Sequence, residues 1–557
     1  MKTLSPVHSG LLATLHDHAA RWPERVALIM LGDGENESER LTYAALDARV
    51  RAFTAVLHSR GLQGQRVLVA EPPGVDFVVA FLACLQAGVV AVPVPDRPQG
   101  RWAAQVLAIA ADCAAAALIA PAPWPALDLP LVSPQVACGE LAPSGRPHEP
   151  APDALAYLQY TSGSTAAPKG VMITFGNLAA NQAMISEAQA HTRFPNEVVL
   201  SWLPPYHDMG LVGGLLQPLW LGATSVLMPP LHMLARPLRW LQAIHRYRVA
   251  VSGGPNFAYQ TCVERIQPQD LAGLDLSCWR LAYVGAEPVR LPTLEAFAAL
   301  LAPTGFDRRA FYPCYGMAET VLFATGGNAG AGAHAGDLGP ELGESVTACG
   351  HAWSGAEVCV VDPQTYRPCA DGEAGEIWLA GPHVAAGYWQ RPDETQQRFQ
   401  AQLADSPTAN YLRSGDRGVM QGGVLHVLGR LDDLIIVRGA NHHPEDLEAL
   451  LCTVHPALQS VLVFQTERAS LSHIVVVAEL RRNALADVSP LQLQAEVSAS
   501  LTRFAGLRAD AVLLLRPGSI LRTSSGKPRR RACAEAYSRG DWPRQTEPQE
   551  QKEFHHG

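Results

Sequence analysis

Two strand-like runs, Arg66-Val-Leu-Val-Ala70 and Val89-Val-Ala-Val-Pro93, enclose an apolar helical pattern at residues 75–88 and decide the fold class. Strand, helix and strand in this order are typical of a parallel sheet with a crossover helix. The same order returns with strand-like runs at residues 198–203, 223–228, 249–252 and 280–285. The sequence therefore predicts an α/β fold whose sheets are mainly parallel.

The amino-acid composition changes at residues 326–343, where seven glycines in eighteen residues predict a loop. Shorter alternating segments follow at residues 357–361, 376–380 and 424–428, and they indicate antiparallel strands of a small β subdomain. After Gly429 the pattern restarts, with a strand at 434–437, a helix at 444–451 and a strand at 473–480. We expect a large N-terminal domain over residues 1–430, a small α+β C-terminal domain over 431–540, and a disordered tail over 541–557.

Composition narrows the classes of function. The 557 residues are 48% hydrophobic and 17% charged, which is enough apolar material for more than one core. The formal net charge is -9 and no long block of Lys and Arg occurs, so a nucleic-acid surface is not expected. Eleven cysteines without a CxxC pair favour reduced core residues over a disulfide framework or a thiolate zinc site.

The start of the chain and its most apolar stretch bear on localisation. The first residues lack the charged start, apolar run and cleavage site of a signal peptide. Residues 103–122 are rich in Ala, carry Asp112, and hold few large apolar side chains, which favours a buried helix leading into a strand over a membrane span. We expect a cytoplasmic protein with no membrane span.

The most informative local motif is Tyr160-Thr-Ser-Gly-Ser-Thr-Ala-Ala-Pro-Lys-Gly170. A loop dense in hydroxyls and glycines, ending in a lysine, offers backbone N–H groups, hydroxyl donors and one positive charge to a polyphosphate. The spacing excludes a Walker loop, because Lys169 is not preceded by Gly and followed by Ser or Thr. A plain Ser/Thr-rich turn is the simpler alternative.

This motif resembles the phosphate loop of the adenylate-forming superfamily, which comprises acyl-CoA synthetases, nonribosomal peptide adenylation domains and luciferases. Four further motifs follow in that family's order: Tyr315-Gly-Met-Ala-Glu319, Ser414-Gly-Asp416, residues 429–439 and Ser524-Ser-Gly-Lys-Pro-Arg529. The sequences of residues 202–211, 252–259, 284–289 and 438–446 resemble those of the fatty acyl-AMP ligase branch. The likeness covers residues 10–535 and implies a large N-terminal domain, a mobile C-terminal lid, and an active site between them.

The resemblance also implies roles for individual residues. ATP would be bound through its phosphates by Thr161, Ser162, Gly163, Ser164, Thr165 and Lys169, and its base would lie against Gly285, Ala286, Glu287, Cys314, Tyr315, Gly316 and Met317. Glu319 would be the Mg2+ ligand, since a hard cation between phosphate oxygens prefers a carboxylate. Asp416 would hold the ribose hydroxyls, with Arg430 near ribose and phosphate. The alternatives are an exposed glutamate and ordinary loop ion pairs.

The resemblance likewise assigns catalytic roles to Lys527 and to His207, the latter in the acyl pocket near the carboxylate. Lys527 follows a small-residue loop that could deliver its ammonium group to charge shared between carboxylate and α-phosphate. The alternative is a solvated lysine in a basic tail. His207 and Asp208 fall where the family lines the acyl pocket, although a hydrogen-bonded core histidine fits equally. An apolar tunnel could use Trp202, Met209, Leu215, Phe257 and Tyr259, which could also be core.

The chain departs from the family's pattern at three places. Ala166 stands where relatives usually have Gly, which costs about 1 kcal/mol if that position needs positive φ. Asp432 occupies the hinge position, where CoA-forming relatives often have Asp and acyl-AMP ligases often have Lys. Residues 324–349, which correspond to an insertion thought to discourage CoA use, are short and rich in Gly. These departures leave the final acceptor open.

The expected reaction is ATP-dependent activation of a fatty acid to acyl-AMP, followed by transfer to the thiol of a separate acyl carrier protein. Between Leu507 and Arg531 seven basic residues face one acidic residue, Asp510, and this excess could dock an acidic carrier or CoA, or could simply be solvated. A fatty acyl-CoA ligase is the first alternative. A catalytically silent nucleotide- or lipid-binding homologue is a second. An amino-acid adenylating enzyme is disfavoured, because no α-amino-binding Asp can be located.

Overall fold

The computed structural model describes residues 10–97, 99–134, 150–161, 168–191, 197–339, 346–433, 435–437, 440–442, 444–468, 471–482, 484, 488–522 and 527–541. The chain divides into two compact units, with the boundary between Leu428 and Gly429. The larger unit contains an eight-stranded, a six-stranded and a five-stranded sheet, and the smaller unit contains a three-stranded sheet.

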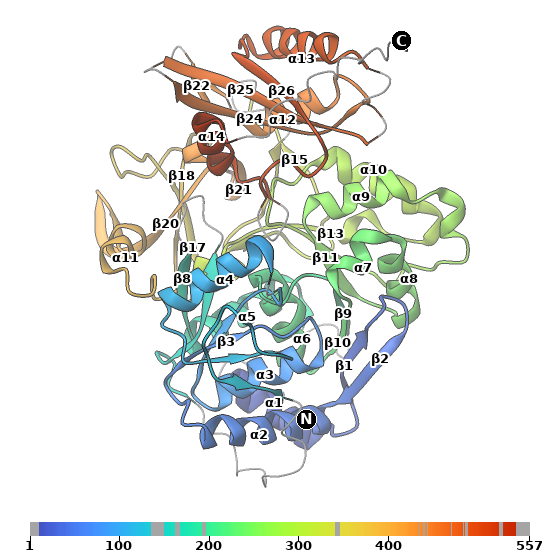
Figure 1. Cartoon of the computed structure of the whole chain (residues 1–557), viewed down its shortest axis with the longest axis vertical. Coiled ribbons are helices and arrows are strands. Elements are labelled where there is room, and N and C mark those ends of the chain that lie inside the picture. The colour runs from blue at the N-terminus through green and yellow to red at the C-terminus, as the bar shows by residue number, and fades with distance from the viewer. Residues whose placement is uncertain are drawn as a thin grey trace, which may run out of the picture. The chain divides into compact units, whose positions relative to one another are not determined.

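The eight-stranded sheet positions most of the candidate site. Its order is β14 (Thr325–Gly326), β13 (Phe311–Tyr315), β12 (Leu281–Val284), β11 (Val251–Gly254), β9 (Val198–Ser201), β10 (Thr224–Leu227), β1 (Val26–Leu31) and β2 (Glu37–Thr42). The six strands from β13 to β1 are parallel, and the two outer strands are antiparallel to their neighbours. The predicted parallel α/β arrangement is therefore confirmed (Figure 1).

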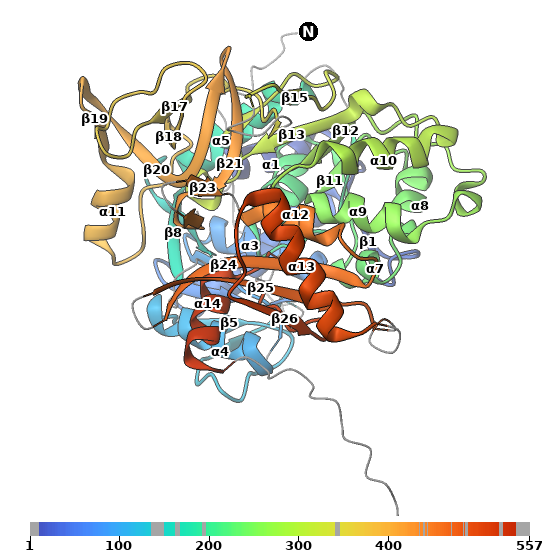
Figure 2. The same cartoon turned by 90° about the horizontal axis from the view of Figure 1, so that it is seen from above.

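Alternate residues of these strands enter two different cores, as the period of a strand requires. One face packs against α8 (Leu238–Tyr247), α9 (Asn256–Arg265) and α10 (Leu291–Leu301), which gather over β11 and β12 in Figure 2. The other face packs against α5 (Phe175–Ala188), the π-helix η4 (Met209–Leu216) and α6 (Gln217–Leu221). Both faces are covered, which explains why these strands read as continuous apolar runs in the sequence.

The six-stranded sheet contains the strand–helix–strand unit from which the fold was predicted. Its order is β6 (Leu131–Val132), β5 (Ala117–Ile119), β3 (Arg66–Val69), β4 (Val90–Pro93), β7 (Leu155–Thr161) and β8 (Lys169–Thr174). The strands β3 and β4 are parallel and are joined by α3 (Val75–Gln86), whose side chains share a core with α1 (Leu11–Arg21) and α2 (Tyr43–Ser59). The stretch 103–122 forms α4 (Gly100–Asp112) and then β5, as predicted.

The five-stranded sheet is antiparallel, as its alternating segments predicted. It comprises β17 (Glu357–Val361), β18 (Ala374–Ala380), β20 (Ser406–Gln421), β19 (Ala401–Leu403) and β21 (Val424–Arg430), with α11 (Pro392–Phe399) beside β20. The segment 326–343, predicted as a loop, contains the short strand β15 (Ala335–Gly336), which pairs with β16 (Val346–Thr347) beyond it; residues 340–345 lie outside the described residues.

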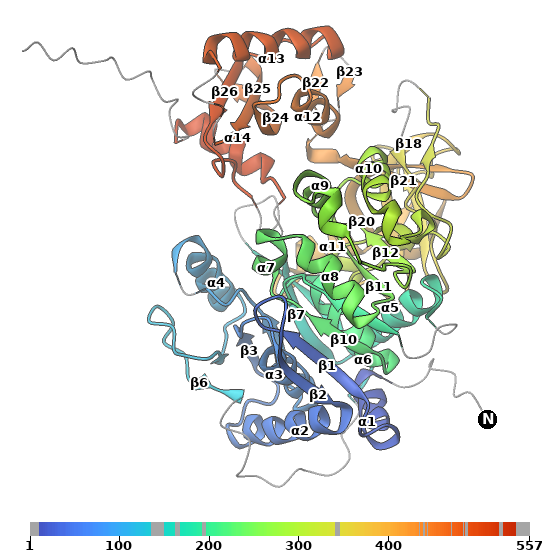
Figure 3. The same ribbon diagram turned by 90° about the vertical axis from the view of Figure 1, so that its right-hand side faces the viewer.

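The smaller unit is a three-stranded sheet covered on both faces. The strands β24 (Leu458–Arg468), β25 (Leu471–Leu480) and β26 (Ala511–Leu515) lie between α13 (Pro490–Ala505) and α14 (Arg530–Arg539), as Figure 3 shows. The helix α12 (Pro444–Cys452) packs on the same face as α13, and β22 (Ile435–Val437) pairs with β23 (Ala440–His442). The expected disordered tail falls on residues 542–557, outside the described residues, apart from Asp541.

The described part of the chain bears on two expectations, that no helix spans a membrane and that the cysteines are reduced. There, each helix is too short or too polar to cross a bilayer. The ten cysteines in that part are free. Their burial raises the pKa of several thiols, including that of Cys314 to about 12, which keeps those thiols protonated at neutral pH.

Candidate active site

The predicted adenine residues meet at the carboxyl-terminal edge of the eight-stranded sheet. Gly285 and Ala286 follow β12, and Cys314, Tyr315 and Gly316 end and follow its parallel neighbour β13. All five line one cavity. The carboxyl ends of parallel strands are the usual place for a ligand in open α/β sheets, because the loops that follow them diverge there.

The walls of this edge are formed by backbone, which is why glycine is needed. A Cβ atom on Gly316 would lie 1.7 Å from the carbonyl oxygen of Leu322. A Cβ atom on Gly285 would lie 3.0 Å from the carbonyl oxygen of Cys314 and 3.2 Å from its Sγ. Ala286 has φ of +67°, a left-handed conformation that costs about 1 kcal/mol for a residue with a Cβ. The edge therefore provides a narrow slot suited to a flat ring.

Two of the predicted base-binding residues have structural contacts nearby. Glu287 accepts a hydrogen bond at Oε1 from the backbone N–H of Phe257, 2.5 Å away, near the start of α9. The backbone N–H of Met317 donates to the Thr320 hydroxyl over 3.3 Å, which closes the short turn after β13. Their direct contact with a base stays a prediction.

Asp416, the predicted ribose ligand, lies beside Tyr315. The Tyr315 hydroxyl donates to Asp416 Oδ2 over 2.7 Å, and the backbone N–H of Asp416 donates to Ser414 Oγ over 3.0 Å. This hydrogen bond brings the antiparallel sheet, through β20, to the end of β13. The adenine edge and the predicted ribose ligand are thus adjacent in the larger unit.

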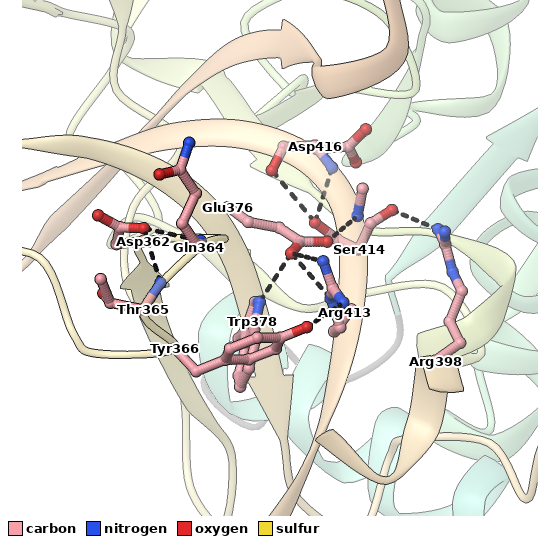
Figure 4. Close-up of polar contacts among 11 residues, drawn as sticks. Asp362, Gln364, Thr365, Tyr366, Glu376, Trp378, Arg398, Arg413, Ser414 and Asp416 are labelled. Atoms are coloured by element: carbon pink, nitrogen blue, oxygen red, sulfur yellow. Dashed lines mark hydrogen bonds and ion pairs between the residues drawn. The ribbon is translucent and has the colours of Figure 1, made fainter. Parts of the chain in front are cut away.

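A buried carboxylate that the sequence analysis missed supports the Asp416 strand. Glu376 on β18 accepts hydrogen bonds from Arg413 Nε at 2.9 Å, Trp378 Nε1 at 3.0 Å and the backbone N–H of Gly415 at 3.1 Å (Figure 4). Its side chain is 3% exposed. A glutamate within the apolar strand Ala-Gly-Glu-Ile-Trp-Leu-Ala was the available signal, because a buried carboxylate needs partners.

Lys169 belongs to the predicted phosphate side of the site. Thr161 ends β7 and pairs with Lys169, the first residue of β8, while the predicted loop residues Ser162, Gly163, Ser164 and Thr165 lie outside the described residues. Lys169 Nζ forms an ion pair with Glu394 on α11 and lies 5.4 Å from the centre of the Tyr388 ring. Neither Glu394 nor Tyr388 was predicted from the sequence.

Glu319, the predicted Mg2+ ligand, is joined to the same cluster. The Tyr388 hydroxyl donates to Glu319 Oε1 over 2.7 Å, and burial raises the pKa of Tyr388. Among the described residues no three His, Cys, Asp or Glu side chains are grouped as a metal site. A single carboxylate fits Mg2+ only together with phosphate oxygens and water, which is how this ion is commonly held beside nucleotides.

A largely apolar cavity leads from the adenine edge into the larger unit. It occupies about 710 Å³ with its open mouth included. It is lined by residues of α5, η4, β9, β11 and β12 and of the segments that follow them, among them Ile185, Asp208, Met209, Val199, Val251, Tyr283 and Phe323. Of the apolar tunnel candidates, Met209 lines this cavity, whereas Trp202, Leu215 and Tyr259 are fully buried core residues.

His207 and Asp208 differ in their positions. Asp208 lines the cavity and accepts a hydrogen bond from the backbone N–H of Met209 over 2.7 Å, at the start of η4. The His207 ring packs against Tyr206, with 4.9 Å between ring centres. The role of His207 in the acyl site stays a prediction.

Lys527 and Arg430 belong to the smaller unit. Lys527 is exposed and directly precedes the segment that leads into α14, and the loop residues 523–526 before it lie outside the described residues. Arg430 ends β21, two residues after the end of the larger unit. Their roles toward ATP and the acyl group stay predictions.

The chain is similar to proteins of known class over almost all its length. The AMP-binding enzyme family model matches residues 15–389. A medium-chain-fatty-acid–[acyl-carrier-protein] ligase, JamA of Moorena producens, is 36% identical over 96% of each chain.

Solved structures of fatty acyl-adenylate ligases are also similar to this chain. One from a study of fatty acyl-adenylate ligases of E. coli and L. pneumophila is 32% identical, has a TM-score of 0.86, and matches 96% of this chain and 99% of its own. The L. pneumophila fatty acyl-adenylate ligase in complex with acyl adenylate and pyrophosphate is also 32% identical, with a TM-score of 0.74 and coverage of 96% and 97%. The predicted family is confirmed: the chain belongs to the AMP-binding enzymes, in their fatty acyl-AMP ligase branch.

Proposed function

We propose that this protein uses ATP to convert a fatty acid into its acyl-AMP with release of pyrophosphate, and then transfers the acyl group to the phosphopantetheine thiol of a separate acyl carrier protein. The observation that carries the proposal is the cavity described above. It begins at the backbone-walled edge suited to adenine and continues as an apolar passage. A single cavity that joins a nucleotide edge to apolar lining fits an acid with a long alkyl chain.

The first step is an in-line displacement at the α-phosphorus. A carboxylate oxygen of the fatty acid forms a bond to that phosphorus, and the bond to the bridging oxygen breaks, so that pyrophosphate leaves with the electron pair. Both reactants are anions, so positive charge must offset their repulsion. We assign Lys169 to the β and γ phosphates and Lys527 to the charge shared between carboxylate and α-phosphate.

The remaining residues bind and orient ATP. Asp416 would accept hydrogen bonds from the ribose hydroxyls, held in place by Tyr315 and by the Glu376 network. Glu319 would hold Mg2+ together with phosphate oxygens, and the ion would neutralise phosphate charge when bound. The slot at Gly285 and Gly316 would take the adenine ring.

The acceptor is assigned from the relatives and from charge. JamA is named as a ligase to an acyl carrier protein. The basic excess between Leu507 and Arg531 is smaller than the sequence suggests, because Arg530 is buried in ion pairs with Asp433, Glu445 and Glu448. Arg522 and Arg531 pair with Glu479 and Glu535. An acidic carrier domain would therefore meet a mixed surface, and CoA is kept as the alternative acceptor.

Pyrophosphate release tests the first step. Wild-type protein with ATP, Mg2+ and straight-chain fatty acids should release pyrophosphate in an acid-dependent way, and mass spectrometry should detect acyl-AMP. Lys527→Ala should lower the rate by orders of magnitude while ATP binding persists, because its interaction belongs to the transition state. Arg531→Ala, a nearby exposed cation, is the control. Acid-independent release, or a near-normal rate for Lys527→Ala, would contradict the assignment.

Acyl transfer tests the second step. Preformed acyl-AMP on the enzyme should load a holo carrier protein much faster than CoA. An apo carrier protein, which lacks the phosphopantetheine thiol, serves as the control and should remain unloaded. Equal or faster use of CoA would favour the acyl-CoA ligase alternative.

A further inference from the structure

A short segment of the larger unit connects the predicted Mg2+ ligand with the predicted phosphate-binding lysine. Residues 385–389 lie between β18 and α11. The backbone N–H of the first residue of this segment donates to the carbonyl of Glu319 over 2.9 Å. The backbone N–H of its last residue donates over 2.8 Å to the carbonyl of Gly170, which follows Lys169 on β8. The segment is therefore fixed at one end to Glu319 and at the other end beside Lys169.

The side chain of Tyr388, within this segment, contacts the same two residues. Its hydroxyl donates to Glu319 Oε1 over 2.7 Å. The centre of its ring lies 5.4 Å from Lys169 Nζ, within the range of a cation–π contact. One side chain thus holds the carboxylate through its hydroxyl and the ammonium group through its ring. A carboxylate that accepts a hydrogen bond at one oxygen can still offer its other oxygen to a cation.

Tyr388 is itself held from the side of α11. The Phe399 ring packs against it edge to face, with 5.1 Å between ring centres. The backbone N–H of Tyr388 donates to Thr395 Oγ1 over 3.0 Å. A Cβ atom on Gly387 would lie 2.3 Å from Thr395 Cγ2, so this close approach requires glycine. Tyr388 is 4% exposed, and these contacts leave its ring little freedom to turn away.

The chain just after this segment is also tied to the other flank of the predicted phosphate loop. Arg391 Nη2 forms an ion pair with Asp112 Oδ1 over 2.6 Å. The Tyr160 hydroxyl donates to Asp112 Oδ2, also over 2.6 Å. Tyr160 lies before the predicted loop and Lys169 at its end, so side chains of residues 388–391 connect to both flanks of that loop.

We propose that Tyr388 is a positioning residue for Mg2+ and ATP. Its hydroxyl orients the Glu319 carboxylate for the ion, and its ring holds the Lys169 ammonium group for the phosphates. This inference rests on the proposed function, from which it takes the roles of Glu319 and Lys169. A partner that orients a metal ligand through a hydrogen bond commonly contributes about 10- to 100-fold to metal affinity. A tyrosine that only filled space would make no such contribution.

Calorimetric titration with ATP, in the absence of fatty acid, tests the inference without turnover. Each protein is titrated once in excess Mg2+ and once in EDTA, and the Kd in EDTA divided by the Kd in Mg2+ gives the contribution of the ion. Tyr388→Phe keeps the ring and removes the hydroxyl. The ratio should therefore fall about tenfold, while the Kd in EDTA keeps its wild-type value. A wild-type ratio in Tyr388→Phe would overturn the role of the hydroxyl.

Tyr43→Phe is the matched control. Tyr43 is also buried, and its hydroxyl donates over 2.7 Å to the carbonyl of Ala223. Ala223 immediately precedes β10, so this hydrogen bond lies at the amino-terminal edge of the eight-stranded sheet, opposite the predicted adenine edge. Tyr43→Phe should keep the wild-type ratio, although it also loses one buried hydrogen bond. An equal fall of the ratio in both variants would show a general effect of packing and would overturn the inference.

Tyr388→Leu tests the contact between the ring and Lys169. Besides the fall in the ratio, the Kd for ATP in EDTA should rise about threefold, because the cation–π contact is lost. A wild-type Kd in EDTA would contradict the role of the ring. If this variant does not fold, Tyr388→Phe still decides the role of the hydroxyl, since it preserves the packing of the ring.

Failure of this inference can be distinguished from failure of the proposed function. Equal ATP affinity of the wild type in Mg2+ and in EDTA would overturn the inference, whereas acid-dependent pyrophosphate release would still support adenylation. Conversely, a fall of the ratio in Tyr388→Phe without acid-dependent release from the wild type would support the inference and contradict the proposed function.

Discussion

The predicted adenine edge and the predicted ribose strand are built in different ways. At the adenine edge, Gly285 and Gly316 allow backbone atoms to approach closely, so the shape of the slot comes from the main chain. At the ribose strand, Asp416 is held by Tyr315 and by hydrogen bonds that converge on Glu376. The first region depends on the absence of side chains and the second on their charge. Substitutions should therefore act through steric overlap in the first region and through lost charge and hydrogen bonds in the second.

The largest expected effect is at the adenine edge. Gly316→Ala would bring a Cβ atom to 1.7 Å from the Leu322 carbonyl oxygen, and backbone must move to relieve that overlap. We expect a loss of more than about 3 kcal/mol in unfolding free energy, with loss of ATP binding. Chemical denaturation and nucleotide binding measure the two effects. Gly327→Ala is the control, since its Cβ meets nothing within 4 Å. Wild-type behaviour of Gly316→Ala would show that the edge is not defined by backbone contact.

A buried carboxylate that forms no ion pair with the described residues sharpens the contrast with Glu376. Glu71, which follows β3, is 3% exposed, and Oε1 has no hydrogen-bond partner among the described residues. Burial raises its pKa to about 7, with smaller contributions from Asp76 and Asp96. The folded state therefore favours the protonated form, and its stabilisation is complete below the unfolded pKa and lost as pH rises through about 7.

Glu71→Gln should remove this pH dependence. The wild-type chain should lose up to about 3 kcal/mol more than the variant between about pH 4 and about pH 8. Denaturant midpoints of the larger unit at these pH values measure the difference. Exposed Glu373→Gln serves as the control and should follow the wild type. Parallel pH curves for wild type and Glu71→Gln would mean that Glu71 is ionised without cost in the folded chain.

Glu376→Gln tests the ribose strand itself. The change removes the charge that Arg413 faces, and because Arg413 is partly exposed, the expected loss is about 2 kcal/mol. We also expect the KM for ATP to rise about tenfold, since the hydrogen bond to the backbone of Gly415 orients the Asp416 strand. Asp405→Asn, which breaks an exposed pair with Arg367, should change neither quantity. Stability loss without a change in KM would make Glu376 purely structural.

The smallest expected effect is that of Tyr315→Phe. It removes one hydrogen bond to Asp416 and leaves the ring against the cavity, so the KM for ATP should rise about fivefold, with the KM for the fatty acid unchanged. Tyr247→Phe, which removes a hydroxyl that donates to Glu37 on β2, at the opposite edge of the eight-stranded sheet, is the control. Equal effects on both substrates would place Tyr315 in general packing and not in ribose positioning.

The strands and the motif residues could be predicted because their signals are local. Residues 66–70, 75–88 and 89–93 repeat an apolar period that a strand, a helix and a strand each require, and β3, α3 and β4 follow it closely. Gly316 was predicted from its motif, but the physical reason, the Leu322 carbonyl, depends on a turn whose path no motif specifies.

The missed residues depend on contacts between distant segments. Glu376 meets Arg413 only because β18 and β20 are paired, and Arg280 meets Glu197 only because the sheet brings the starts of β9 and β12 together. Tyr388 and Glu394 likewise reach Lys169 from another part of the chain. A charged residue within or directly before a buried strand was the available hint in three of these cases, but it identifies no partner.

The ion pair between Lys169 and Glu394 has a consequence for the arrival of ATP. In the free enzyme the Glu394 carboxylate offsets the positive charge of the Lys169 ammonium group, so Lys169 attracts a distant anion only weakly. If Lys169 binds the phosphates as proposed, an incoming polyphosphate must displace the Glu394 carboxylate from the ammonium group. The contribution of Lys169 to the rate of encounter with ATP should therefore be small and should depend only weakly on ionic strength.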